Sequence, residues 1–161
     1  MTNSCRLVMV ALMLCGLNTS CGAGEIPPEY KNFFSVPASQ ERREFREYPL
    51  EKQIDIHLIA ATYFRPPKFG FSYDIAARGN EAIPALLSRL KADSSEAYRG
   101  PIIYVFRVMV KFHYDFRDEK EVMDTLKAVV SSMKDQFYRE ESERLLKEIL
   151  SEPKKEGAPV P

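Results

Sequence analysis

The amino-acid sequence predicts an all-α protein whose main domain, residues 49–150, consists of antiparallel helix pairs. Apolar side chains recur there at intervals of three and four residues, which is the spacing of one helix face. Residues that favour helix starts and stops separate these apolar segments. Part of the pattern also repeats after 40 residues, which favours stacked helix pairs. A compact, irregular bundle of helices is the structural alternative.

The clearest predicted helix covers residues 80–92, directly after Gly79. Its apolar face consists of Ile83, Leu86, Leu87 and Leu90. Asn80 is a favourable N-cap residue, and Glu81 suits the positive end of the helix dipole. The polar residues 93–95 end this helix.

The next segment, Ile102–Tyr114, fits two periodicities. Alternating polar residues are typical of a half-buried strand, whereas the apolar spacing is typical of a helix. We favour a helix because the segment is long for a strand and no partner strand is visible. Gly100 and Pro101 suit an N-cap followed by proline at the first helical position, so the predicted helix begins at Ile102.

Further helices are predicted at Leu50–Phe64, Ser72–Arg78, Glu119–Met133 and Phe137–Leu150. The first has a core stripe that includes Ile54 and Leu58, and residues 65–67, Arg-Pro-Pro, stop it. Gly79 closes the predicted helix Ser72–Arg78 in the C-cap position. Each of these segments has one apolar face, which the domain core would cover.

The first 24 residues are predicted to be a targeting segment outside the folded domain. Arg6 precedes an apolar run at 7–14 that is too short for a comfortable transmembrane span. Small and polar residues then lead to Cys21, and this arrangement resembles a bacterial lipoprotein signal. The resemblance implies cleavage before Cys21, lipid attachment to it and a place in the bacterial cell envelope. Ordinary cleavage after Ala23, giving a secreted or periplasmic soluble protein, and an uncleaved anchor are the alternatives.

Two further segments flank the predicted domain. Residues 25–48 are interpreted as a proline-containing tether and a charged lead-in whose Arg and Glu residues pair on a solvated helix. Residues 151–161 are interpreted as a disordered tail. All three cysteines lie in the first 24 residues, so no disulfide is expected after cleavage. The balance of 23 basic and 23 acidic residues gives no sign of a nucleic-acid partner.

The 40-residue repeat carries a resemblance to a known family. The shift aligns Tyr98-Arg99 with Tyr138-Arg139 and superposes apolar positions on both sides. Residues 82–87, Ala-Ile-Pro-Ala-Leu-Leu, resemble the first helix of a HEAT repeat. The resemblance implies an α-solenoid, in which Asp93 and Arg99 would tie the turn within a repeat to its neighbours. It also implies a helical surface that binds a protein or peptide.

Catalytic, cofactor and metal sites are not predicted, because the sequence holds no nucleophile, phosphate-loop or zinc motif. His57 is interpreted as a partly buried core residue, and His113 as the end of a helix near Asp115. The candidate binding surface is aromatic and lies around Pro66-Pro67. It comprises Tyr63, Phe64, Phe69, Phe71 and Tyr73, whose alternative role is to close the core beneath a loop.

Two functions follow from these observations. The first is a membrane-tethered, non-catalytic protein that binds a protein or peptide partner through its helical repeat. The second is an exported, hydrolase-like enzyme with an unrecognised site. A shallow groove lined with aromatic residues would favour the first function. A deep pocket holding His57 or His113 beside carboxylates would favour the second.

Overall fold

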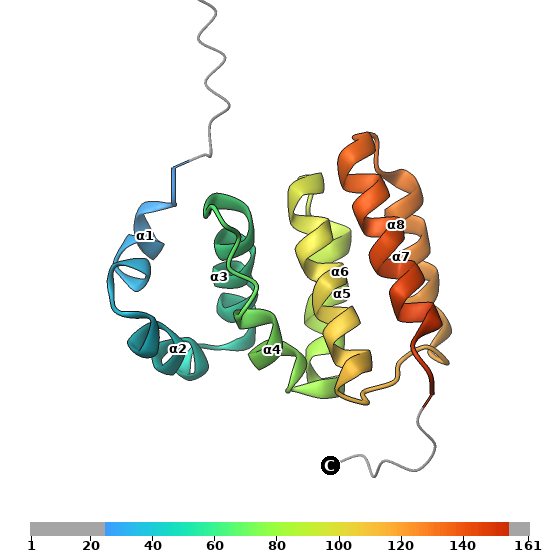
Figure 1. Cartoon of the computed structure of the whole chain (residues 1–161), viewed down its shortest axis with the longest axis horizontal. Coiled ribbons are helices and arrows are strands. Elements are labelled where there is room, and N and C mark those ends of the chain that lie inside the picture. The colour runs from blue at the N-terminus through green and yellow to red at the C-terminus, as the bar shows by residue number, and fades with distance from the viewer. Residues whose placement is uncertain (1–24, 155–161) are drawn as a thin grey trace, which may run out of the picture.

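The computed structural model describes residues 25–154, and every regular element in this part of the chain is helical (Figure 1). The predicted all-α class is therefore confirmed. The predicted targeting segment, including Cys21, lies outside the described residues, as does the tail beyond residue 154.

The helices succeed one another with short connections. In chain order they are α1 (Pro28–Lys31), the 3-10 helix η1 (Phe33–Ser35), α2 (Ala38–Glu47), α3 (Leu50–Tyr63), α4 (Phe71–Ala76), the 3-10 helix η2 (Gly79–Ala82), α5 (Ile83–Ala92), α6 (Glu96–Lys111), α7 (Lys120–Ser132) and α8 (Gln136–Ser151). Figure 1 shows them side by side, from α1 and α2 at one end to α7 and α8 at the other.

The C-terminal half consists of two helix pairs, α5–α6 and α7–α8, each joined by a short turn. Helix α5 contacts α7, and α6 contacts α8, so equivalent helices of the two pairs lie against each other. The boundaries also keep the 40-residue offset, since α5 and α7 end at 92 and 132 while α6 and α8 begin at 96 and 136. This arrangement is compatible with a solenoid and with a bundle.

Helix α6 forms the centre of the molecule and contacts α3, α4, α5 and α8. Its side chains Ile102, Val105, Phe106 and Met109 are completely buried. Phe106 packs edge-on against Phe116, with ring centroids 5.0 Å apart. This burial on several sides explains why the segment shows both a helical and an alternating pattern.

The predicted start of this helix at Ile102 is wrong. Helix α6 begins at Glu96, and Pro101 lies inside it. A proline inside a helix removes one backbone hydrogen bond, so sequence rules place it at a helix start instead. Here the neighbouring helices cover much of α6 and stabilise it through packing, which outweighs the lost bond.

The entry to α5 also differs from the prediction. Gly79 has a positive φ of 57°, and residues 79–82 form η2 before α5 begins at Ile83. Asn80 therefore does not cap α5. A Cβ atom on Gly79 would lie 2.5 Å from Cε1 of Tyr114, so this position requires glycine for both backbone and space.

Residues 25–48 are packed against the domain rather than extended away from it as a tether. Phe33 and Phe45 are buried in the same core as α3 and α6, and Phe45 stacks on Phe71 at 4.5 Å. The predicted charge pairs within α2 reach other segments instead. Glu41 binds Lys68, while Arg42 and Arg46 both bind the carboxylate of Asp74.

Candidate functional site

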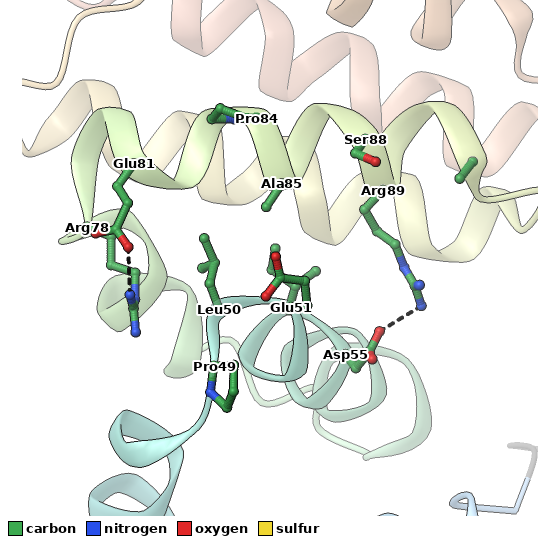
Figure 2. Close-up of a pocket in the computed structure, with 12 residues that line it drawn as sticks. Pro49, Leu50, Glu51, Asp55, Arg78, Glu81, Pro84, Ala85, Ser88 and Arg89 are labelled. Carbon is green, nitrogen blue, oxygen red and sulfur yellow. Dashed lines mark hydrogen bonds and ion pairs between the residues drawn. The ribbon is translucent and has the colours of Figure 1, made fainter.

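Several surface depressions lie along the helices of residues 25–154, and two of them bring candidate functional groups together. The larger one, with a volume of about 750 Å³, separates α3 from α5 and is drawn in Figure 2. We call it the charged cleft. Its lining includes Leu50, Asp55, Arg78, Glu81, Ala85 and Arg89.

The charges of this cleft pair mainly with each other. Arg89 binds Asp55 at 2.8 Å and Asp93 at 3.2 Å, and Arg78 binds Glu81 at 3.1 Å. Figure 2 shows Arg89 reaching across from α5 to Asp55 on α3. The arginines of the charged cleft therefore stabilise the packing of neighbouring helices and leave little charge for a ligand.

The second depression has a volume of about 460 Å³ and lies between the end of α3, the N-terminal half of α6 and the first half of α8. Its surface is mostly apolar. We call it the aromatic groove. Its lining includes Arg65, Phe69, Pro101, Tyr104, Phe137 and Tyr138.

Aromatic rings form both walls of the aromatic groove. On one side Phe69 contacts Tyr104, with ring centroids 4.8 Å apart. On the other side Phe137 meets Tyr138 edge-on at 5.4 Å. The Phe137 side chain is 72% exposed, although most rings of this size are covered in a folded domain. The walls therefore present apolar surface to whatever enters the groove.

The floor of the groove comes from α6, where Ala97, Gly100 and Pro101 line it. Proline has no backbone N–H, so Pro101 cannot donate to the carbonyl of Ala97 as another residue would. Glycine at position 100 keeps the helix surface flat at this point. The floor is therefore flat at Gly100, and the carbonyl of Ala97 lacks the N–H donor that position 101 would normally supply.

Two arginines stand in the lining of the groove, and their partners differ. Arg144 binds the carboxylates of Glu141 and Glu148. Arg65 instead donates from Nη1 to the carbonyl oxygens of Thr62 and Phe64, at 2.8 and 2.7 Å. Within residues 25–154, Arg65 has no carboxylate partner.

The structure places only Phe69 of the five predicted aromatic residues in the groove. Phe71 is buried against Phe45, and Tyr63 shares a hydroxyl contact of 3.3 Å with Tyr98. Phe64 packs on Phe34, while Tyr73 is exposed near Phe112. The five predicted residues therefore make different contacts, and Phe69 alone among them lines the groove.

Most of the groove residues that the sequence alone does not predict come from α6 and α8, and Arg65 follows α3. Tyr104, Phe137 and Tyr138 are distant from Phe69 in the chain, and helix packing brings all four to the same groove. Tyr98-Arg99 and Tyr138-Arg139 form a pair that repeats after 40 residues. That repeat was the one signal that pointed to Tyr138.

The predicted pair Asp93 and Arg99 does not form a salt bridge with each other. The Asp93 carboxylate binds Arg89, while Nη2 of Arg99 donates to the backbone carbonyl of Asp93 at 3.4 Å. Nη1 of Arg99 also reaches Oγ of Ser132 at 3.4 Å, at the end of α7. Arg99 thus links the turn of its own helix pair to the next pair through hydrogen bonds.

The turn between α7 and α8 has a stronger tie to the preceding pair. The Glu96 carboxylate accepts hydrogen bonds from the backbone N–H groups of Lys134 and Asp135, both at 2.8 Å. These backbone donors lower the pKa of Glu96 because they favour its charged form. Sequence rules had assigned Glu96 no role, since its partners lie in another turn.

Neither histidine lines the charged cleft or the aromatic groove. His57 is completely buried, and its Nε2 lies 3.2 Å from the carbonyl oxygen of Pro101. Burial lowers its pKa to about 4, so the ring is neutral at pH 7. His113 adopts a positive φ of 70° just after α6 and is exposed. In residues 25–154 no group of three or more His, Cys, Asp or Glu side chains could hold a metal ion.

No protein-family model, curated protein or solved structure matches this chain. None of the helices within residues 25–154 has the length and apolar composition needed to span a membrane.

Proposed function

We propose that this chain is a non-catalytic binding protein whose aromatic groove holds a segment of a protein or peptide partner. The observation that carries the proposal is the groove itself, an apolar depression of about 460 Å³ with the exposed ring of Phe137 on its edge. Aromatic side chains on a folded surface are typical of recognition sites, because they bury much area with few rotatable bonds.

A variant of the exposed ring tests this function. Phe137→Ala removes part of one groove wall and should leave the fold intact, because 72% of the side chain is exposed. We expect peptides selected from a display library by the wild-type protein to bind this variant at least tenfold more weakly. Truncation of a central aromatic contact usually costs that much or more.

Leu150→Ala is the matched control. Leu150 is also an exposed apolar residue of α8, at 52%, but it does not line the groove. Selected peptides should bind this variant as they bind the wild type. Equal binding by the wild type and Phe137→Ala would contradict the proposed site.

We also propose that lipid attached to Cys21 tethers the protein to a membrane of the bacterial cell envelope. The apolar run and the small residues before Cys21 support this proposal. Intact-mass analysis of the processed protein should give a lipid-modified chain that begins at Cys21, and Cys21→Ser should abolish the modification. An unmodified chain that begins at Gly24 would contradict lipid attachment while leaving export in place.

A further inference from the structure

We infer that the aromatic groove takes an extended peptide with an acidic side chain, which Arg65 binds while neighbouring apolar residues cover the aromatic walls. This inference rests on the proposed function and adds the chemistry of the partner to it. Three features of the groove carry it: the free edge of Arg65, the charge balance of the lining and the acceptor in the floor.

Arg65 has an unused donor edge at the groove. Both of its hydrogen bonds leave from Nη1 and reach backbone carbonyl oxygens, which fixes the side chain without neutralising its charge. The Nε and Nη2 groups have no partner within the described part of the chain. These two groups form the edge of a guanidinium that binds a carboxylate through two parallel hydrogen bonds.

The other charges in the lining cancel. Glu141 binds Arg144, and Arg144 also binds Glu148 on the same helix. The positive charge of Arg65 is therefore the uncompensated charge of the groove. A single carboxylate beside apolar groups complements this arrangement. A polyanion does not, because it would need several unpaired cations.

The floor favours an extended backbone. The carbonyl of Ala97 lacks the donor that Pro101 would otherwise supply, and both residues line the groove. An extended peptide has free N–H groups that can bond to such an acceptor, whereas the N–H groups of a helical peptide are used internally. A volume of about 460 Å³ accommodates a few side chains, which also fits a short extended segment.

Peptides that differ by one charge test the inference. Two fluorescent peptides, acetyl-Pro-Leu-Pro-Leu-Glu-Pro-Leu-amide and its Gln counterpart, are titrated into the whole 161-residue chain and followed by anisotropy. We expect the Glu peptide to bind roughly threefold to tenfold more tightly, because only it forms a charge-assisted pair with Arg65.

Charge reversal gives the sharper result. In Arg65→Glu the preference should invert, so that a Lys peptide of the same design binds better than the Glu peptide. Arg43→Glu is the matched control, because Arg43 is exposed on α2, away from the groove, and the change in net charge is the same. The control should keep the wild-type preference for the Glu peptide.

Other binding results would overturn either the role of Arg65 or the proposed function. Equal binding of the Glu and Gln peptides overturns the role of Arg65. The proposed function survives this result if Phe137→Ala still weakens the binding of both peptides. If Phe137→Ala binds both peptides as tightly as the wild type does, the proposed function itself is overturned. If sedimentation of the protein alone shows a dimer that Phe137→Ala dissociates, a second copy occupies the groove and the peptide assignment is wrong.

Discussion

At the scale of single residues, His57 is a completely buried titratable group in the core of this protein. Its Nε2 lies within hydrogen-bond distance of the Pro101 carbonyl, so Nε2 carries the proton and donates it. Its Nδ1 is buried without a hydrogen-bond partner in the described structure. Protonation of Nδ1 would place a charge where neither water nor a protein acceptor can stabilise it.

This geometry predicts a loss of stability in acid. The pKa of His57 falls from 6.5 to about 4 in the folded state, so the unfolded chain binds the proton first as the pH decreases. His57 therefore costs nothing above pH 6.5 and destabilises the fold progressively between pH 6.5 and 4, by roughly 2–3 kcal/mol. Urea unfolding at pH 7 and pH 4.5 measures the loss.

His57→Gln is the comparison that isolates this contribution, because the amide can still donate to Pro101 but does not titrate. Carboxylates such as Asp115 also have lowered pKa values and weaken the fold as they protonate. The prediction therefore concerns how much more stability the wild type loses in acid than His57→Gln does. An equal loss of stability in both between pH 7 and 4.5 would show that His57 does not titrate as described.

Gly79 gives a second prediction at this scale. Gly79→Ala should reduce the free energy of unfolding by about 2–4 kcal/mol, because φ is positive and the new methyl group collides with Tyr114. Gly70→Ala is the control, since a Cβ there meets nothing within 4 Å and φ is −56°. The control should be neutral or stabilising by up to about 1 kcal/mol. Similar melting temperatures for both variants would refute the described contact.

At the scale of helices, a side chain in the preceding turn stabilises the start of α8. Asp135 caps α8, because its carboxylate accepts hydrogen bonds from the N–H groups of Phe137 and Tyr138. Asp135→Ala should cost about 1 kcal/mol, as for other N-cap residues. Asp124→Ala, which removes an exposed pair with Lys120, should cost much less. Thermal unfolding of the two variants gives the comparison, and equal losses would contradict the capping role.

Arg99 is predicted to connect the two helix pairs. Arg99→Ala removes the hydrogen bonds to the Asp93 carbonyl and to Ser132, so we expect a cost of about 1 kcal/mol. Arg43→Ala serves as the surface control, with an expected effect within about 0.5 kcal/mol. Chemical denaturation measures the free energy of unfolding of both variants. If both variants unfold like the wild type, Arg99 contributes nothing to the junction between the pairs.

The sequence predicted the type of the longer helices well and their starts less well. Apolar spacing was sufficient for α7 and α8, because each has one buried and one exposed face. It also indicated α3, although residues 56–61 of that helix are all buried. The start of α6 was wrong because tertiary packing stabilises Pro101 inside the helix, which a local rule cannot anticipate. Residues 25–48 looked like a tether because of their prolines and charged residues, whereas in the structure their aromatic residues Tyr30, Phe33, Phe34, Phe45 and Tyr48 pack on the core.

At the scale of the whole molecule, the aromatic groove arises from the stacking of α8 on α6 beside the end of α3. Phe69 was predicted as a binding residue from its local aromatic surroundings. Phe137 and Arg65 were not, because their importance depends on exposure and on unpaired charge, and neither is visible in a single sequence. Helix packing therefore decides which aromatic residues become a binding surface.

Chemical-shift mapping of the acidic peptide tests the central claim most directly. Amide signals of the ¹⁵N-labelled protein are followed while the Glu peptide is added. The account predicts that the largest changes fall on residues of the aromatic groove, including Ala97, Gly100, Tyr104 and Phe137. Residues of the charged cleft, such as Asp55 and Ala85, should change little. Shifts concentrated in the charged cleft would contradict the assignment of the aromatic groove as the binding site.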